Sequence, residues 1–205
     1  MKRIILLIGG GSRVPAILQA IDDKKINGQI VYAITHKKES PGLELLKSRG
    51  VPAEFFSLKQ WQEAGNSRPS YDAELAKKVI AHNPDLIVLA GWMLVLSNEF
   101  IKHFPNKIIN LHPALNPSFA GAHGVEDAFN YGVKITGATV HFVPDEAVDT
   151  GPIITQGAVN VDDTDTIETL AQKVHALEDE LLPRAIALFC DDKLDINGRK
   201  VHIKK

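Results

Sequence analysis

The 205-residue chain has a single cysteine, no apolar run long enough to span a membrane, and no excess of charge of one sign. With Cys190 alone, neither an internal disulfide nor a multi-cysteine metal site can form, so a reducing, cytoplasmic setting is expected. The apolar run at the start covers only residues 4–8, which is too short for a secretion signal. A formal net charge of -2 supplies no basic field for nucleic acid. The expected partners are therefore small molecules, with no nucleic acid and no membrane, for a monomer or homodimer.

What the chain does have is the composition of one soluble globular domain, with 44% hydrophobic and 23% charged residues. Short apolar runs alternate with helical patterns. The runs expected as buried strands are residues 4–8, 30–34, 53–56 and 86–90. The segments expected as helices begin at residue 14 and cover 43–49 and 71–82. Residues 57–70 are polar and contain Gly65 and Pro69, which predicts a surface loop.

The second half of the chain continues the alternation of strands and helices and ends in a long helix and a hairpin. A strand ending near residue 112 precedes a helix over 124–131 and two strands over 135–142 and 153–161. Asp165 followed by Glu168 predicts the capped start of a long helix, with a kink at Pro183, and the Asn-Gly pair within 194–201 predicts a terminal hairpin. The predicted fold class is α/β: an open, mostly parallel twisted sheet with helices on both faces, a C-terminal long helix and a terminal hairpin.

A glycine-rich turn follows the first predicted strand, as Gly9-Gly10-Gly11-Ser12-Arg13. Unpaired backbone N–H groups at the start of the following helix favour a phosphate, although a purely structural turn is also common at this place. A nicotinamide dinucleotide fingerprint requires a third glycine, and Val14 stands in that position. The pattern therefore favours a phosphate over a redox dinucleotide.

Two polar side chains end a buried apolar strand in the stretch Asn110-Leu111-His112-Pro113. Because they are two positions apart, both lie on the same face of the strand, and both can donate to a developing negative charge. Asp149 lies in a predicted turn before Gly and Pro, where a histidine of a neighbouring strand can meet it. For His141 the structural and functional interpretations both stay open. No tight pair of metal-ligand spacing occurs among the eight histidines, so no metal is expected.

Glu178 falls on the buried face of the long helix, where an unpaired carboxylate is costly. It therefore needs a cationic or hydrogen-bonding partner. One interpretation is an internal salt bridge. The other is that Glu178, with His175 one turn earlier, reaches a substrate amine or hydroxyl.

Taken together and in order, these motifs resemble the phosphoribosylglycinamide formyltransferase family, of the folate-dependent formyltransferase superfamily, over nearly the whole chain. The segments that carry the resemblance are the glycine loop, Leu89-Ala90-Gly91-Trp92-Met93, Asn110-Leu111-His112-Pro113, Gly121-Ala122-His123, Val140-His141-Phe142-Val143 and Val148-Asp149-Thr150-Gly151-Pro152. The family usually has other residues at four places, namely Ile8, Gly10, Arg13 and Leu94.

The resemblance implies a single formyltransferase domain over residues 1–205, with a phosphate-binding half over 1–105 and a catalytic and folate-binding half over 106–205. It implies a catalytic set of Asn110, His112 and Asp149. The residues implied to bind phosphoribosylglycinamide are Gly11, Ser12, Arg13, His175 and Glu178. Those implied to bind folate are Arg68, Met93, Leu94, Val95, Leu96, Asn110 and Asp145.

The activity that the resemblance implies is acyl transfer in purine (IMP) biosynthesis, with 10-formyltetrahydrofolate as co-substrate and no metal. The substrate amine attacks the formyl carbon directly, so no protein nucleophile is needed. Asn110 and protonated His112 are expected to donate to the oxyanion, and the nearby Asp149 carboxylate is expected to raise the pKa of His112.

Other functions stay open on the same residues. A formyltetrahydrofolate hydrolase, or a formyltransferase acting on methionyl-tRNA or an amino sugar, would use the same catalytic set. The tRNA enzyme is expected to carry an additional basic C-terminal domain, and the hydrolase an N-terminal regulatory domain. A non-catalytic nucleotide or phosphate sensor would use only the glycine loop.

Overall fold

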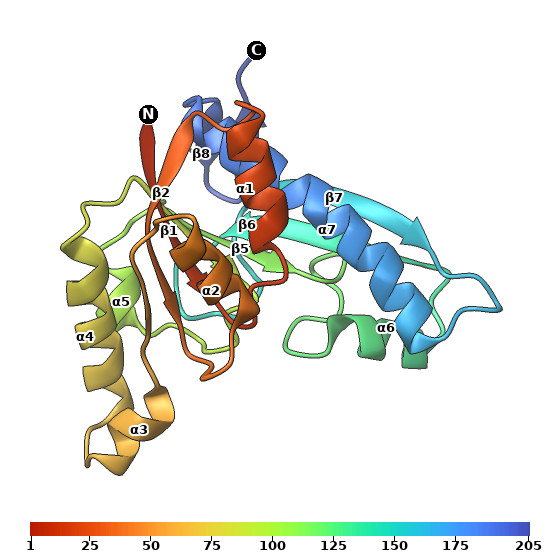
Figure 1. Ribbon diagram of the computed structural model, residues 1–205. Helices are drawn as coiled ribbons and strands as arrows, with labels where there is room; N and C mark the ends of the chain where they lie inside the picture. The colour runs from red at the N-terminus through yellow and green to blue at the C-terminus, as the bar shows by residue number, and fades with distance from the viewer.

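A computed structural model describes all 205 residues, and its nine strands form one continuous sheet in the order β3-β2-β1-β4-β5-β6-β7-β9-β8 (Figure 1). The five parallel strands are β1 (Lys2–Ile8), β2 (Gly28–Thr35), β3 (Ala53–Phe55), β4 (Leu86–Ala90) and β5 (Ile108–His112). The remaining strands are β6 (Ile135–Phe142), β7 (Ile153–Asn160), β8 (Leu194–Asn197) and β9 (Lys200–Ile203). Because β6 runs antiparallel to β5 and β7 antiparallel to β6, the sheet is mostly parallel but mixed.

Seven helices connect and cover these strands. They are α1 (Val14–Asp22), α2 (Pro41–Ser48), α3 (Leu58–Glu63), α4 (Arg68–Ile80), α5 (Asn98–Ile101), α6 (Gly124–Tyr131) and α7 (Ile167–Cys190). The long helix α7 passes through Pro183 as one element and packs against α1, α6, β6 and β7. Figure 1 shows α1, α2 and α7 over one part of the sheet, with α4 and α5 on the other side.

The period-two alternation of β1 divides the core between the two faces of the sheet. Ile4, Leu6 and Ile8 belong to the cluster that α1, α2 and α7 complete. Ile5 and Leu7 belong to the cluster that α4 and α5 complete. All five side chains are fully buried, which explains the continuous apolar run. The predicted open sheet with helices on both faces is confirmed.

The prediction of a surface loop over residues 57–70 is wrong, because α3 and the start of α4 lie there. Two serines of this polar stretch are helix N-caps. Ser57 Oγ accepts from the Gln60 N–H at 3.2 Å, and Ser67 Oγ accepts from the Ser70 N–H at 3.3 Å. A proline in the first turn of α4 costs no hydrogen bond because the N–H groups there have no helical partner.

The start of α7 is also shifted by one residue from the predicted cap. Thr166 is the N-cap and forms a capping box with Thr169, in place of Asp165 and Glu168. Asp165 instead accepts hydrogen bonds from the Thr169 hydroxyl and from Lys173. The predicted terminal hairpin is confirmed as β8 and β9, with Gly198 in the left-handed region between them.

The order in which the chain adds strands reverses between β1 and β4. After β1 the chain adds β2 and β3 on one side of β1, and it then returns to add β4 and β5 on the other side. In such sheets a ligand cleft lies beyond the carboxyl ends of the strands at this point. The glycine loop follows β1, and an apolar loop follows β4. The Asn110 and His112 segment ends β5, so three of the predicted motifs converge there.

Candidate active site

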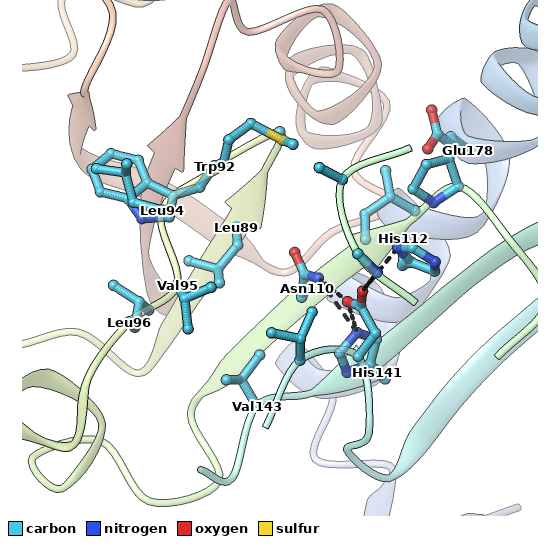
Figure 2. Close-up of a pocket in the computed structure, with 18 of the residues that line it drawn as sticks. Leu89, Trp92, Leu94, Val95, Leu96, Asn110, His112, His141, Val143 and Glu178 are labelled. Atoms are coloured by element: carbon cyan, nitrogen blue, oxygen red, sulfur yellow. Dashed lines mark hydrogen bonds and ion pairs between the residues drawn. The ribbon is translucent and has the colours of Figure 1, made fainter. Parts of the chain in front are cut away.

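A cavity of about 410 Å³ lies at this edge of the sheet, a size within the usual range for small-molecule sites. Figure 2 shows its two unlike ends. Apolar side chains of the loop after β4, among them Trp92 and Leu94, form one end. Asn110 and His112 lie between this end and Glu178, which reaches in from α7. The site therefore combines a slot for a flat apolar group with a polar end.

The Asp149 carboxylate is the centre of the polar contacts. Its Oδ2 lies 3.1 Å from His112 Nδ1 and accepts from the Gly121 N–H at 2.9 Å. Its Oδ1 lies 3.3 Å from His141 Nε2 and accepts from Asn110 Nδ2 at 3.1 Å. Asp149 is 9% exposed, and both histidines are 2% exposed. The predicted meeting of Asn110, His112 and Asp149 is thus present, with His141 as a fourth member.

Sheet register and a strained turn place these groups. Asn110 on β5 pairs directly with His141 on β6, which puts the two side chains on one face. Asp149 has φ 54°, in the left-handed region that non-glycine residues seldom adopt. Asn116 Nδ2 donates to the Asp149 carbonyl oxygen at 2.9 Å and so supports this conformation. The carboxylate is held by the fold and does not depend on a ligand for its position.

Burial and hydrogen bonding compete at Asp149. Burial acts to raise its pKa, but the hydrogen bond with His141, the Gly121 N–H and the two histidine charges together bring the pKa below its ordinary value of 3.8. Asp149 is therefore ionised at neutral pH.

The Asp149 carboxylate raises the pKa of His112 as expected, but burial has the larger effect and leaves the pKa below the ordinary 6.5, so the expectation of a protonated ring is wrong. The Asp149 carboxylate and the Phe119 carbonyl oppose only part of this effect, and the nearby His141 adds to it. Both ring nitrogens face oxygen acceptors, since Nε2 lies 2.8 Å from the Phe119 carbonyl oxygen. Only a protonated ring could donate to both at once. The ionised carboxylate is the stronger acceptor, so a neutral ring carries its hydrogen on Nδ1.

The glycine loop is built into the fold by close packing. Gly11 has φ +82°, and a Cβ atom on it would lie 2.6 Å from Gly42 Cα. Ser40 Oγ donates to the Gly9 carbonyl oxygen at 2.8 Å. Ser12 and Arg13 line the cavity, whereas Gly11 lies behind them against α2.

The Arg13 side chain turns toward α7. Its Nη1 donates to the His175 carbonyl oxygen at 2.6 Å and to Asp179 Oδ1 at 2.9 Å, and lies 3.6 Å from Glu178 Oε2. Glu178 is 6% exposed, and burial raises its pKa to about 7, with Arg13 opposing and Asp179 adding to the shift. Burial and Arg13 lower the pKa of His175. The predicted internal salt bridge therefore exists, and Glu178 also lines the cavity.

The loop after β4 presents apolar side chains to the cavity and to solvent. Met93 and Val95 are 53% and 55% exposed, and exposed apolar side chains grouped beside a pocket are typical of a ligand-binding groove. Arg68 does not line the cavity; it pairs with Asp72 at 3.2 Å and donates to the Val95 carbonyl oxygen, so it supports the loop from behind. Asp145 lines the cavity from the opposite loop.

The structure thus brings together all the predicted site residues except Gly11 and Arg68. Sequence reasoning left His141 undecided and did not include Trp92 in the site. The signal for His141 is its pairing with Asn110, which depends on strand register. No group of three or more His, Cys, Asp or Glu side chains is placed to bind a metal ion, and none of the helices has the length and apolar character needed to cross a membrane.

A mostly parallel sheet with a polar constellation and an apolar slot at the carboxyl ends of its strands defines the class of α/β proteins that act on small molecules in a cleft at the sheet edge. Within that class, the chain belongs to the formyl transferase family, whose model matches residues 1–186.

Named relatives are similar over most of the chain. Glycinamide ribonucleotide transformylase 1 from Symbiobacterium toebii superimposes with a TM-score of 0.94 at 39% identity, covering 100% of this chain and 95% of that one. Phosphoribosylglycinamide formyltransferase of Mycobacterium tuberculosis is 38% identical over 199 residues, which is 97% of this chain and 89% of the relative. The trifunctional purine biosynthetic protein adenosine-3 of Drosophila melanogaster is 40% identical over 92% of this chain, which spans only 14% of that protein's length.

Proposed function

We propose that the chain transfers the formyl group of 10-formyltetrahydrofolate to the amine of phosphoribosylglycinamide, giving formylglycinamide ribonucleotide and tetrahydrofolate in de novo purine biosynthesis. The observation that carries this proposal is the position of the Asn110, His112 and Asp149 contacts between an apolar slot and a buried carboxylate. The names of the M. tuberculosis and S. toebii relatives support the choice of acceptor. We place the activity in the cytoplasm.

The apolar end of the cavity fits the flat ring system of a folate. Leu89, Trp92, Leu94, Leu96 and Val143 line it and offer little that a charged group could use. When bound, the co-substrate supplies a formyl group attached to nitrogen. Asp145 and the loop that carries Asp149 close the same end from the other side.

The other end fits a phosphorylated amine. The N-terminus of α1 and the preceding glycine loop offer backbone N–H groups to a phosphate, with the Ser12 hydroxyl beside them. His175 and Glu178 would contact the ribosyl and glycinamide portion. On this basis residues 1–105 are the phosphate-binding half and residues 106–205 the catalytic half of one domain, although both halves line the cavity.

The acid–base roles follow from the electrostatics of the site. Asn110 Nδ2 donates to the formyl oxygen as negative charge develops there. Ionised Asp149 holds the Nδ1 hydrogen of His112, so Nε2 of the neutral ring is the basic atom. It accepts a proton from the attacking amine once the Phe119 carbonyl moves off it, and returns the proton to the departing nitrogen. The bond from the amine to the formyl carbon forms, and the bond from that carbon to the folate nitrogen breaks.

One experiment distinguishes the proposed transfer from the alternatives, which are a hydrolase, a transferase with another acceptor and a phosphate sensor. Purified protein is incubated with 10-formyltetrahydrofolate, with and without phosphoribosylglycinamide, and the absorbance change is followed. Conversion only with the acceptor is expected. Conversion without it would show a hydrolase, and no conversion in either case would favour another acceptor or the sensor. Size-exclusion chromatography tests the prediction of a monomer or homodimer.

A further inference from the structure

The loop after β4 carries Trp92 into the apolar end of the cavity, although few hydrogen bonds hold its backbone. Residues 92–96 make no backbone–backbone hydrogen bond, and the loop is fastened at Val95, whose carbonyl oxygen accepts from Arg68. Trp92 is nevertheless only 6% exposed, and it lines the cavity beside Leu94 (Figure 2). The position of this indole ring therefore depends on the side chains packed against it.

One of these side chains is His36, which follows β2 and does not line the cavity. Its ring centroid lies 4.8 Å from that of Trp92, and the two ring planes are 84° apart, which is an edge-to-face contact. Because β2 and β4 lie on either side of β1, this contact crosses the end of β1. Gly9 lies there, and a Cβ atom on it would lie 2.4 Å from the Gly91 carbonyl oxygen. The absence of a side chain at Gly9 thus lets the loops after β1 and β4 meet.

The two rings pack together without a hydrogen bond. His36 Nδ1 and Trp92 Nε1 are both buried, and neither has a hydrogen-bond partner in the chain. Burial lowers the pKa of His36 below the ordinary 6.5, with the Lys37 charge adding to the shift and the Ile8 backbone opposing it. The imidazole is therefore neutral at pH 7 and offers no cation to the indole face. Edge-to-face packing is what remains to hold the two rings together.

We propose that His36 is a positioning residue for co-substrate recognition: through its edge-to-face contact it holds the Trp92 indole in place as a wall of the apolar slot. The inference rests on the proposed function for the identity of the ring that enters the slot, a folate. Because His36 acts through Trp92 from outside the cavity, its removal weakens folate binding and leaves the acceptor end unchanged. An aromatic ring without nitrogen can replace it.

The test compares His36→Ala with His36→Phe and with a matched control, His82→Ala. Phenylalanine keeps an aromatic ring at this place and removes the unpartnered nitrogen. His82 also packs on an aromatic ring, that of Tyr32 at 3.9 Å, and neither of these two residues lines the cavity.

The first readout is the KM for each substrate. An edge-to-face pair contributes a factor of about three to ten, so His36→Ala should raise the KM for 10-formyltetrahydrofolate about threefold to tenfold. The KM for phosphoribosylglycinamide and kcat should stay within about twofold of wild type, because His36 does not line the cavity. His82→Ala should change none of the three values.

The second readout is direct binding and needs no turnover. The chain has two tryptophans, so Trp61→Phe leaves Trp92 as the only indole. Quenching of its fluorescence by tetrahydrofolate gives a dissociation constant, which His36→Ala in this background should raise by the same factor of about three to ten. His36→Phe should bind within about twofold of its parent, because the ring contact is kept.

An unchanged folate KM and dissociation constant in folded His36→Ala would overturn the proposal. Equal losses for both substrates would also overturn it, because they indicate a general effect on the fold. A His36→Phe variant as weak as His36→Ala would show that Trp92 requires the imidazole nitrogen and not the ring packing, which contradicts the proposal as well.

Failure of the proposed function gives a different result. If the wild-type protein binds tetrahydrofolate but transfers no formyl group, the proposed function fails on its own, and the fluorescence titration still decides the role of His36. A wild-type protein that does not bind tetrahydrofolate would overturn both.

Discussion

Glu178→Gln should make the protein more stable at alkaline pH and leave it nearly unchanged at acid pH. The folded chain holds the Glu178 proton more tightly than the unfolded chain, because burial raises the carboxyl pKa from its ordinary 4.5 to about 7. The contribution that this tighter proton binding makes to the unfolding free energy is fully present below pH 4.5, and it is lost as the pH rises through about 7. Glutamine has no charge to bury, so the variant does not undergo this loss.

The size of the effect follows from the two pKa values. The difference between 4.5 and about 7, at about 1.4 kcal/mol per pH unit, corresponds to about 3 kcal/mol of unfolding free energy above pH 7. We expect Glu178→Gln to recover about 1 to 3 kcal/mol at pH 8, since the new amide still has to be accommodated beside Arg13. Arg13 keeps its bonds to Asp179 and the His175 carbonyl, so its own charge stays paired.

The assay is urea unfolding followed by tryptophan fluorescence at pH 5, 6, 7 and 8, for wild type and variant. Other groups titrate equally in both proteins, so the difference between the two isolates Glu178. Glu180→Gln is the matched control, because Glu180 is an exposed residue on the same helix with no ion pair, and it should show no such trend. A stability difference that stays constant from pH 5 to pH 8 would refute the reasoning.

Three further substitutions test the site and its support. His112→Ala should lower turnover about a hundredfold or more, because the proposed base is removed, and near-normal turnover would exclude His112 from the chemistry. Asp149→Asn should cause a comparable loss and move the acidic limb of the pH–rate profile to lower pH, since the carboxylate supports the pKa of His112; an unmoved limb would contradict this role. Gly11→Ala should destabilise the fold by about 1 to 3 kcal/mol, because the φ of +82° is strained for alanine and the added methyl group would lie 2.6 Å from Gly42 Cα. Thermal unfolding measures this loss, and an unchanged Tm would show that the loop can relax.

The sequence by itself determined the layers of the fold. The unbroken apolar run of β1 requires cover on both faces, and two separate clusters of buried side chains provide it. Asn110 and His112 were predictable as site residues because a strand places alternate side chains on one face and Pro113 ends it at the cleft. The Asn-Gly turn between β8 and β9 is a local property, and the hairpin forms where the sequence indicates.

Only the tertiary structure decided what depends on register, burial and contacts between distant segments. His141 joins the site because β6 pairs with β5 in one particular register, which no local pattern specifies. The protonation state of His112 depends on how much water the fold excludes, and burial outweighs the neighbouring carboxylate. The direction of the Arg13 side chain is set by α7, more than 160 residues away in the chain. Local propensity fixes elements, whereas the electrostatics of a site arise from groups that only folding brings together.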